Sequence, residues 1–461
     1  MVTDWTGRGN SYILLWEMSE LVIRGARVVT PQGVREADVL IRDGKIARVG
    51  RVERPAEAFP ARGLLLLPGA IDAHVHLALP VAGTRSADDF ESGTLAAAAG
   101  GVTTIVDFTV GAAEKPLPVA IEGRLEEARK AAVDFSLHAE MIGWTPARKD
   151  ELFQAALLGV RSFKFYMAYG ESGRRTPLDV LKAAMERIAR LGGVAMVHAE
   201  AEELVDPREG PTPEGRPAIA EEVAIAELGI LALRTGCLTY VAHISSTQGL
   251  STFLTAKERG APLMGETCPH YLVLDESVYT RPDGYLYSVT PPLRGSQDQE
   301  ALWLALSRRQ LHAVSTDHCP FTRAQKEPGR DDPTRLPSGL PGVETLLPLL
   351  YSEGVAKGRI SLSDLVWYLA EGPARAFGLW PKKGGIQEGA DADLVLLDPK
   401  ATWTVTAKDL HMATDFSPYE GLEVQGRIVG VLSRGEWLVR DGELLAQPGW
   451  GEFVPWRGGG G

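Results

Sequence analysis

Five side chains that bind metal ions well stand at or near the ends of short apolar segments. His74 and His76 occur in DAHVH, His198 ends AMVH, His243 ends YVAH and Asp317 ends VSTD. Residues two apart on a strand share one side, so the imidazoles of His74 and His76 can reach one point. Imidazole and carboxylate suit zinc and similar divalent ions. One such histidine alone is usually a hydrogen-bonded core residue, but the whole set predicts a metal site.

Lys164, in SFKFYMAY, is the candidate for a further ligand. Four histidines and one aspartate are few for two metal ions, each of which needs several ligands and an open position. An inward lysine on a barrel strand is costly unless it is neutral or paired. A neutral amine can add carbon dioxide and become a carbamate, which is chemically a bridging carboxylate. The residues alone explain Lys164 equally well as one half of a buried salt bridge.

The middle of the chain alternates short apolar segments with amphipathic or Ala-rich ones. The latter, such as Leu178–Leu191, Ala218–Leu233 and Leu250–Arg259, predict helices. Strands with helical crossovers favour a (β/α)₈ TIM barrel, in which active sites gather at the C-terminal ends of the strands, although spacing alone leaves a doubly wound sheet open. The predicted strands are Leu64–Leu77, Thr103–Phe108, Phe135–Gly143, Ser162–Met167, Ala195–Glu200, Leu238–Ser245, Pro262–Leu272 and His312–Asp317.

Both ends of the chain have a different texture, with short strand-like runs separated by Gly and Asp-Gly turns. LVIRGARVV and ADVLIRDGKIARVG near the start are matched by ADADLVLLD and GRIVGVLSRGEWLVRDGELL near the end. Such runs are typical of hairpins, and together they predict one flanking β-sandwich built from both ends. The expected units are an extension (1–17), a first sandwich segment (18–67), the barrel (68–380), a second sandwich segment (381–445) and a tail (446–461).

Charge and cysteine content narrow the class of protein. The net charge of −12 argues against nucleic acid as a partner, because binding phosphates needs a basic face. Three scattered cysteines are too few for a disulfide framework, and a cytoplasmic location fits. The chain has no run of about 18 apolar residues, so no membrane span is expected.

The motifs PGAIDAHVH, SFKFYMAY, MVHAE, VAHISS, CPHYL, TPPLR and STDHCPF together resemble the hydantoinase and dihydropyrimidinase branch of the amidohydrolase superfamily. The resemblance covers nearly the whole chain from Met18. It implies a TIM barrel with a flanking β-sandwich, two divalent metal ions that are usually zinc, and a homotetramer or dimer. The implied reaction opens a small cyclic amide, a hydantoin or dihydropyrimidine, to an N-carbamoyl amino acid.

The resemblance also implies a role for each ligand. His74 and His76 would hold the more buried metal ion, and His198 and His243 the more exposed one. Lys164 would be the carboxylated bridge between the two ions.

The same motifs imply the residues that act on the substrate. Asp317 would contact the first metal ion and act as the base, and Tyr169 would help to polarise the scissile carbonyl. Thr290 stands where the family usually has Ser, and Ser338 where it usually has Asn. In the family these two positions hold the ring amide largely through backbone groups, so the two differences leave the exact ring preference open.

Related activities are less consistent with the sequence. Relatives that hydrolyse dihydroorotate carry an arginine two residues after HxH, whereas this chain has Leu77-Ala78 there. Tyr169 favours the hydantoinase side over allantoinase, which stays the alternative. Non-catalytic scaffold relatives have lost metal ligands, whereas every ligand position is filled here.

Two loops predict the environment of the ring substituent. Val81 stands where relatives often have Phe, which leaves more room, and Arg174 and Arg175 follow Tyr169 closely. If either guanidinium turns inward, it can pair with a carboxylate on the substituent. The hypothesis is a preference for bulky or acidic 5-substituents. The alternative is that both arginines face solvent.

Overall fold

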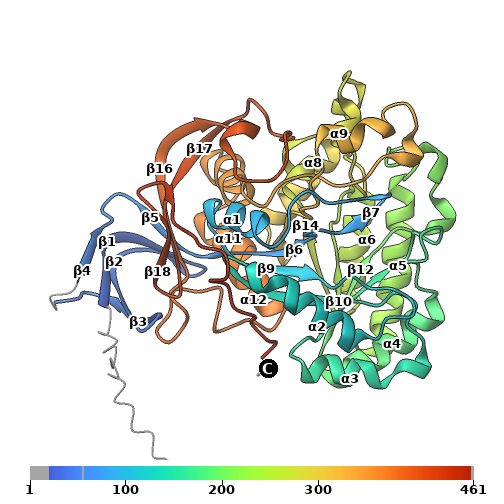
Figure 1. Ribbon diagram of the computed structural model, residues 1–461, viewed down its shortest axis with the longest axis horizontal. Helices are drawn as coiled ribbons and strands as arrows, with labels where there is room; N and C mark the ends of the chain where they lie inside the picture. Colours follow the sequence, from blue (N-terminus) through green and yellow to red (C-terminus); the bar gives the residue numbers. More distant parts are fainter. Residues whose placement is uncertain (1–19, 54–56, 458–461) are drawn as a thin grey trace, which may run out of the picture.

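The computed structural model describes residues 20–53 and 57–457. The predicted extension (1–17) and the last residues of the predicted tail lie outside this range. A barrel surrounded by helices stands beside a β-sheet that contains both early and late strands (Figure 1).

The barrel is an eight-stranded parallel sheet with the order β15-β14-β13-β12-β11-β10-β9-β6. A backbone bridge between Val75 and His318 brings the end of β6 beside the segment after β15, so the sheet curls towards closure. The predicted TIM barrel is confirmed, and an open doubly wound sheet is excluded. The strands are β6 (Ala70–Val75), β9 (Val102–Phe108), β10 (Asp134–Glu140), β11 (Ser162–Tyr166), β12 (Val194–His198), β13 (Leu238–Val241), β14 (Leu263–Thr267) and β15 (Ala313–Val314).

The barrel helices pack through one apolar face each. In α4 the residues Leu181, Ala184, Met185 and Ile188 are buried, which is the spacing of one helical face. Gly192 ends α4 in the left-handed conformation with φ 62°. The helices are α1 (Ser92–Ala99), α2 (Leu117–Glu127), α3 (Asp150–Leu157), α4 (Leu178–Leu191), α5 (Ala218–Thr235), α6 (Thr247–Glu258), α7 (Pro269–Val273), α8 (Ser296–Ser307), α9 (Arg323–Lys326), α10 (Leu346–Leu349), α11 (Leu362–Val366) and α12 (Gly372–Ala376), with π-helical segments Leu350–Ala356 and Trp367–Glu371 extending α10 and α11.

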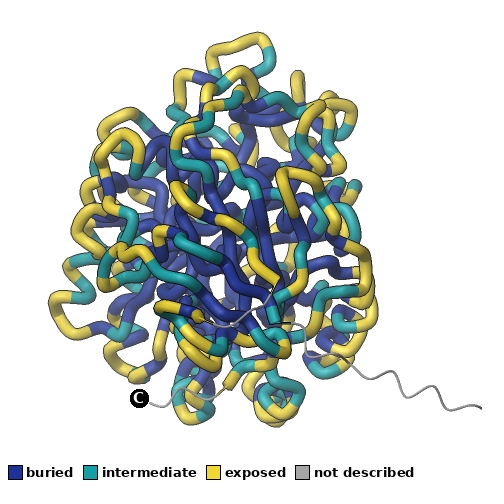
Figure 2. The backbone as a smooth tube through the Cα atoms, turned by 90° about the vertical axis from the view of Figure 1, so that its left-hand side faces the viewer, coloured by how far each residue is buried: buried dark blue, intermediate teal, exposed yellow. Residues whose placement is uncertain are grey.

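The flanking sheet joins the two ends of the chain, as expected. Its central strand β5 pairs in parallel with β1 and antiparallel with β16. All four residues of β5 are buried, and β16 is buried over its first four residues, whereas exposed residues are frequent in the surface loops (Figure 2). The strands are β1 (Glu20–Thr30), β2 (Gly33–Arg42), β3 (Lys45–Gly50), β4 (Glu57–Pro60), β5 (Leu65–Pro68), β16 (Leu394–Thr404), β17 (Glu423–Ser433), β18 (Glu436–Arg440) and β19 (Glu443–Leu444), and the hairpin β7 (Pro80–Val81) and β8 (Thr84–Arg85) lies apart from both sheets.

Several predicted strands were too long, and two of them run into a different element. The predicted strand Leu64–Leu77 is two strands, β5 in the flanking sheet and β6 in the barrel, because the chain changes sheets at Gly69. A Cβ atom at Gly69 would lie 2.1 Å from Thr103 Oγ1, so the close approach at this crossing requires glycine. The predicted strand Pro262–Leu272 ends as β14 at Thr267, and α7 begins at Pro269, whose fixed φ suits the first turn of a helix.

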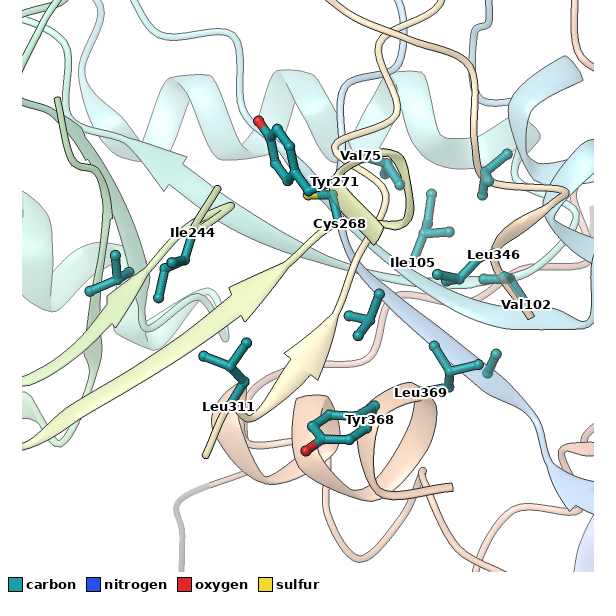
Figure 3. Packing of buried hydrophobic residues seen from close by; sticks show 14 of the residues in the cluster. Val75, Val102, Ile105, Ile244, Cys268, Tyr271, Leu311, Leu346, Tyr368 and Leu369 are labelled. Atoms are coloured by element: carbon teal, nitrogen blue, oxygen red, sulfur yellow. The ribbon is translucent and has the colours of Figure 1, made fainter. Parts of the chain in front are cut away.

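A continuous apolar core fixes the strands that carry the candidate ligands. Val75 on β6 and Val102 and Ile105 on β9 are at most 1% exposed, as are Leu346 and Tyr368 on the covering helical segments (Figure 3). Core side chains pack at the density of organic crystals, so the strand ends are held in fixed positions.

Candidate functional site

All nine predicted site residues line one cavity of about 800 Å³ at the C-terminal ends of the barrel strands. Lys164 lies in β11, His198 is the last residue of β12, and Asp317 lies three residues after β15. The lining residues that the sequence predicted are His74, His76, Lys164, Tyr169, His198, His243, Thr290, Asp317 and Ser338.

One half of the site is built from His74, His76 and Asp317. Asp317 Oδ1 lies 3.2 Å from His74 Nε2 and 3.0 Å from His76 Nε2. Each of the three residues offers a ligand atom within 4.8 Å of the others. His74 Nε2 is buried without a hydrogen-bond partner, a state that is costly unless a further group binds. A divalent cation fits this donor set.

The charge states of these groups suit a cation. Burial lowers the pKa of His74 well below its ordinary value, and Lys164 adds to the effect. Burial acts to raise the pKa of Asp317, but the neighbouring His74 and His76 lower it well below the usual range. Neutral imidazole and ionised carboxylate are the forms that bind metals.

The other half of the site is a pair of facing imidazoles. His198 Nδ1 lies 2.9 Å from His243 Nε2. Burial lowers the pKa of both rings, most strongly for His243, whose Nδ1 is buried without a hydrogen-bond partner. Two neutral rings whose nitrogens converge on one point form a second donor set for a cation.

Lys164 lines the same cavity, is only 1% exposed, and lowers the pKa of histidines in both halves. Its Nζ stands 5.1 Å from the centre of the Phe108 ring and 5.4 Å from that of Tyr166. Within the described residues Lys164 forms no ion pair, so the salt-bridge interpretation gains no support. Burial lowers the pKa of Lys164 to about 8, although Asp317 and Glu266 oppose the shift. Burial therefore makes the neutral amine easier to reach near neutral pH than it is for an exposed lysine.

Three site residues have left-handed backbone conformations that are rare for side chains with a Cβ. The φ angles are 71° for Tyr169, 40° for His243 and 50° for Asp317. Each costs of the order of 1–3 kcal/mol and persists only where the surroundings impose it. Such strain is common at functional sites, and here it lies where the chain leaves the strands and turns towards the cavity.

Glu266, which the sequence analysis missed, orients His74. Its Oε1 lies 2.5 Å from His74 Nδ1, and its Oε2 accepts a hydrogen bond of 2.9 Å from the Tyr240 hydroxyl. The ring therefore donates through Nδ1 and presents Nε2 to Asp317. A carboxylate behind a ligating histidine fixes the tautomer and raises the basicity of the ligand.

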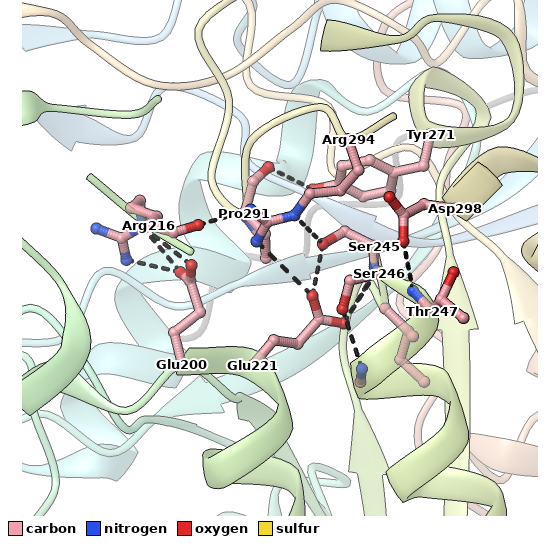
Figure 4. A network of polar contacts seen from close by, with 12 residues as sticks. Glu200, Arg216, Glu221, Ser245, Ser246, Thr247, Tyr271, Pro291, Arg294 and Asp298 are labelled. Carbon is pink, nitrogen blue, oxygen red and sulfur yellow. Dashed lines mark hydrogen bonds and ion pairs between the residues drawn. The ribbon is translucent and has the colours of Figure 1, made fainter. Parts of the chain in front are cut away.

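Glu200 has the same relation to His198 in the other half of the site. Its Oε2 accepts from His198 Nε2 at 2.6 Å. The same oxygen accepts from Arg216 Nη2 at 2.7 Å (Figure 4). The position was detectable, because Glu200 follows His198 by two residues in MVHAE. By contrast, 192 residues separate His74 from Glu266, and no local spacing indicates that pair.

Tyr169 closes one side of the cavity. Its hydroxyl lies 2.6 Å from Thr290 Oγ1, and the Arg216 guanidinium stands 4.8 Å from the centre of its ring. Arg216 therefore contacts the predicted substrate-binding tyrosine and, through Glu200, one predicted ligand.

His270 and His318 are buried near the site without lining the cavity. His318 donates from Nε2 to Asp88 at 3.1 Å and accepts the backbone N–H of Gly342 at Nδ1, also at 3.1 Å. Both ring nitrogens thus hold the loops together.

The neighbouring arginines Arg174 and Arg175 have different surroundings. Arg175 pairs with Glu203, has a side chain 37% exposed, and does not line the cavity. Arg174 lines the cavity, but its Nη1 donates to Glu140 Oε1 at 2.7 Å. The alternative that the arginines face solvent therefore holds for Arg175 only. Arg174 faces the cavity, and the buried Glu140 carboxylate largely offsets its charge.

Comparisons with known proteins identify the family of the chain. The model of the amidohydrolase family matches residues 65–438. A D-hydantoinase of Geobacillus stearothermophilus is 41% identical over 454 residues, which cover 94% of this chain and 96% of that protein. A D-hydantoinase of Streptomyces coelicolor is 39% identical over 462 residues, which cover 95% of this chain and 98% of that protein.

A solved structure has the same fold over nearly its whole length. The crystal structure of dihydropyrimidinase from Brevibacillus agri matches with a TM-score of 0.91 and 37% identity, covering 95% of this chain and 98% of that one. None of the described helices is long and apolar enough to cross a membrane. The chain therefore belongs to the hydantoinase and dihydropyrimidinase branch of the amidohydrolase family.

Proposed function

We propose that this hydrolase opens hydantoin or dihydropyrimidine rings to N-carbamoyl amino acids at the cavity described above. The relatives named D-hydantoinase and dihydropyrimidinase support this substrate class. The observation that carries the proposal is the convergence of His74, His76, His198, His243 and Asp317 on one cavity of about 800 Å³. That volume is ample for a small cyclic amide.

The same proposal includes two divalent metal ions, with zinc the expected metal. His74 and His76 with Asp317 would hold one ion, and His198 with His243 the other. Lys164, carboxylated by carbon dioxide, would bridge them. When bound, such a pair of ions acidifies a water molecule and polarises a carbonyl. The orphaned nitrogens of His74 and His243 and the lowered pKa of Lys164 support this assignment.

The chain's own residues handle the protons and the developing charge. Asp317, ionised and directed into the cavity, accepts the proton that the attacking water loses. It returns that proton to the ring nitrogen as the C–N bond breaks, so the hydroxyl ends on the carbonyl carbon and the hydrogen on nitrogen. The Tyr169 hydroxyl donates a hydrogen bond to the carbonyl oxygen as negative charge develops there. The segments that carry Thr290 and Ser338 hold the ring amide.

A substrate panel tests the proposed function. Purified chain with added zinc is assayed on hydantoin, dihydrouracil, allantoin and dihydroorotate, with Asp317→Asn as the control for contaminating activity. Turnover of hydantoin or dihydrouracil is expected, because these are the two ring classes proposed. Turnover of allantoin or dihydroorotate alone, or equal rates for the control variant, would contradict the proposal.

The assembly and location are also included in this proposal. A homotetramer or dimer is expected, and light scattering on the purified chain measures it. A cytoplasmic location completes the description, and cell fractionation tests it.

A further inference from the structure

Lys326, the last residue of α9, is a fully buried lysine that has no carboxylate partner among the residues that the structure describes. It is 0% exposed, and among the described residues its Nζ forms no ion pair. Burial lowers the pKa of the amine to about 7, with the Cys319 thiol opposing the shift. A buried ammonium is costly unless other groups satisfy its donors, so the acceptors around it must compensate for the lost water.

Four oxygen atoms surround Lys326 Nζ. It donates to the carbonyl oxygens of Leu286 at 2.8 Å, Ser288 at 3.1 Å and Gly339 at 2.8 Å, and to the Ser288 hydroxyl at 2.9 Å. Three of the four are backbone carbonyls, which is the environment of a bound monovalent cation rather than of a salt bridge. The amine thus acts as an internal cation between two backbone segments.

Those two segments carry the predicted ring-binding residues. Ser288 lies two residues before Thr290, and Gly339 lies one residue after Ser338. Further hydrogen bonds run from Gly339 N to Ser288 O at 2.9 Å and from Ser288 Oγ to Pro337 O at 3.1 Å. Lys326 itself does not line the cavity, although Thr290, Ser338 and Gly339 do.

A third segment meets the other two at Gly339. Gly339 has a φ of 148°, which residues with a Cβ rarely adopt. A Cβ at this position would lie 2.3 Å from the Cys319 carbonyl oxygen. Cys319 follows Asp317 by two residues. The packing around Lys326 therefore also touches the loop that carries the predicted base.

We propose that Lys326 is a positioning residue that sets the spacing between the Thr290 and Ser338 segments and thereby the fit of the ring amide. The inference rests on the proposed function, because it assigns these segments to the ring. A compact ammonium on a flexible stem suits four oxygens in different directions, whereas a planar guanidinium does not. Removal of the amine leaves three carbonyls without their shared donor, so the two direct hydrogen bonds at Ser288 are left to join the segments and their spacing becomes less fixed.

The main test is Lys326→Met, which keeps most of the side-chain volume and removes the donors. Kinetics are measured on whichever ring the wild type opens. We expect KM to rise about 10-fold to 100-fold with kcat changed far less, because the two segments bind the ring equally in the ground state and the transition state, and a loss of such uniform binding raises KM alone. Metal content should stay at the wild-type value.

Two further variants complete the design. Ser288→Ala removes one acceptor and the Pro337 contact, folds more easily, and should raise KM in the same direction by a smaller factor. Lys383→Met is the matched control, because Lys383 is also a buried lysine, but it pairs with Asp134 and Asp393 at the junction of the two sheets. Its loss should lower stability without a selective rise in KM.

Hydrogen exchange on the metal-loaded protein gives a readout without substrate. Lys326→Met, or Ser288→Ala if that variant does not fold, should exchange faster in 285–291 and 337–340 than the wild type. Unchanged exchange and unchanged KM, or an equal rise in KM for Lys383→Met, would overturn the inference. A wild type that opens none of the four rings would overturn the proposed function instead, and exchange would still decide the role of Lys326.

Discussion

Replacing Glu266 by glutamine should weaken the binding of one metal ion of the proposed pair and leave the binding of the other unchanged. The glutamine oxygen can still accept from His74 Nδ1, which lies 2.5 Å from the carboxylate, but the charge is lost. A hydrogen bond to a charged group contributes about 1.5–3 kcal/mol and a neutral one about 0.5–1.5 kcal/mol. The expected loss is therefore about 1–1.5 kcal/mol, or roughly tenfold in the Kd of the ion at His74 and His76.

The assay is competition with a chelator, with the two metal equivalents resolved by elemental analysis. Glu200→Gln is the matched variant for the other half, because Glu200 accepts from His198 Nε2 at 2.6 Å. It should release the second ion first, and it should also destabilise the fold, since Arg216 loses its buried partner. Release of the same ion first in both variants, or no change in either, would refute the assignment of one orienting carboxylate to each half.

The remaining predictions concern the base, the bridge and an ionisable pair away from the cavity. Asp317→Asn should keep the fold and much of the metal while the rate falls by about 10²–10⁴-fold, measured as kcat, and a near-wild-type rate would exclude Asp317 as the base. Lys164→Ala should lose activity and most of one metal ion, with partial rescue by short carboxylic acids, whereas two retained ions at full activity would exclude the bridge. His411→Gln should lower Tm more at about pH 6 than at about pH 9, because the bond to Glu344 raises the pKa of His411 and its stabilisation is lost as pH rises through the folded-state pKa. An equal loss of Tm at both pH values would contradict this coupling.

The ligand-type residues were predictable because strand geometry is local. A histidine or aspartate at the end of an apolar run lies at the C-terminal rim of a barrel, wherever its strand falls in the order. His198 is the last residue of β12, and Asp317 lies just beyond β15. The fold class was predictable for the same reason, since it depends on the alternation of segments and not on their contacts.

The boundary at Gly69 was not predictable from the same signal. The run LLLLPGAIDAHV is apolar on both sides of the glycine, and burial in either sheet gives the same pattern. Hydrophobic periodicity reports that a strand is covered, but it does not report which sheet the strand joins. Only the contact between Gly69 and Thr103 distinguishes the two cases.

Arg174 and Arg175 illustrate a different limit. They are adjacent in a loop without period, so neither helical nor strand spacing assigns their directions. Arg174 turns inward because Glu140, at the end of β10, is buried and needs a cation, while Arg175 finds Glu203 at the surface. The decision lies with partners that are distant in sequence, and the same holds for Glu266 and Lys326.

The polar groups behind the cavity follow one physical rule. Two of the predicted ligand histidines each have a buried carboxylate behind the ring, as His74 has Glu266 and His198 has Glu200. The segments proposed to bind the ring have Lys326 behind them in the same way. Burial makes each of these groups costly to leave unpaired, so a displaced side chain cannot find an equally good second position. The penalty for desolvation is thus what holds the geometry of the site to within the tolerance that ring opening requires.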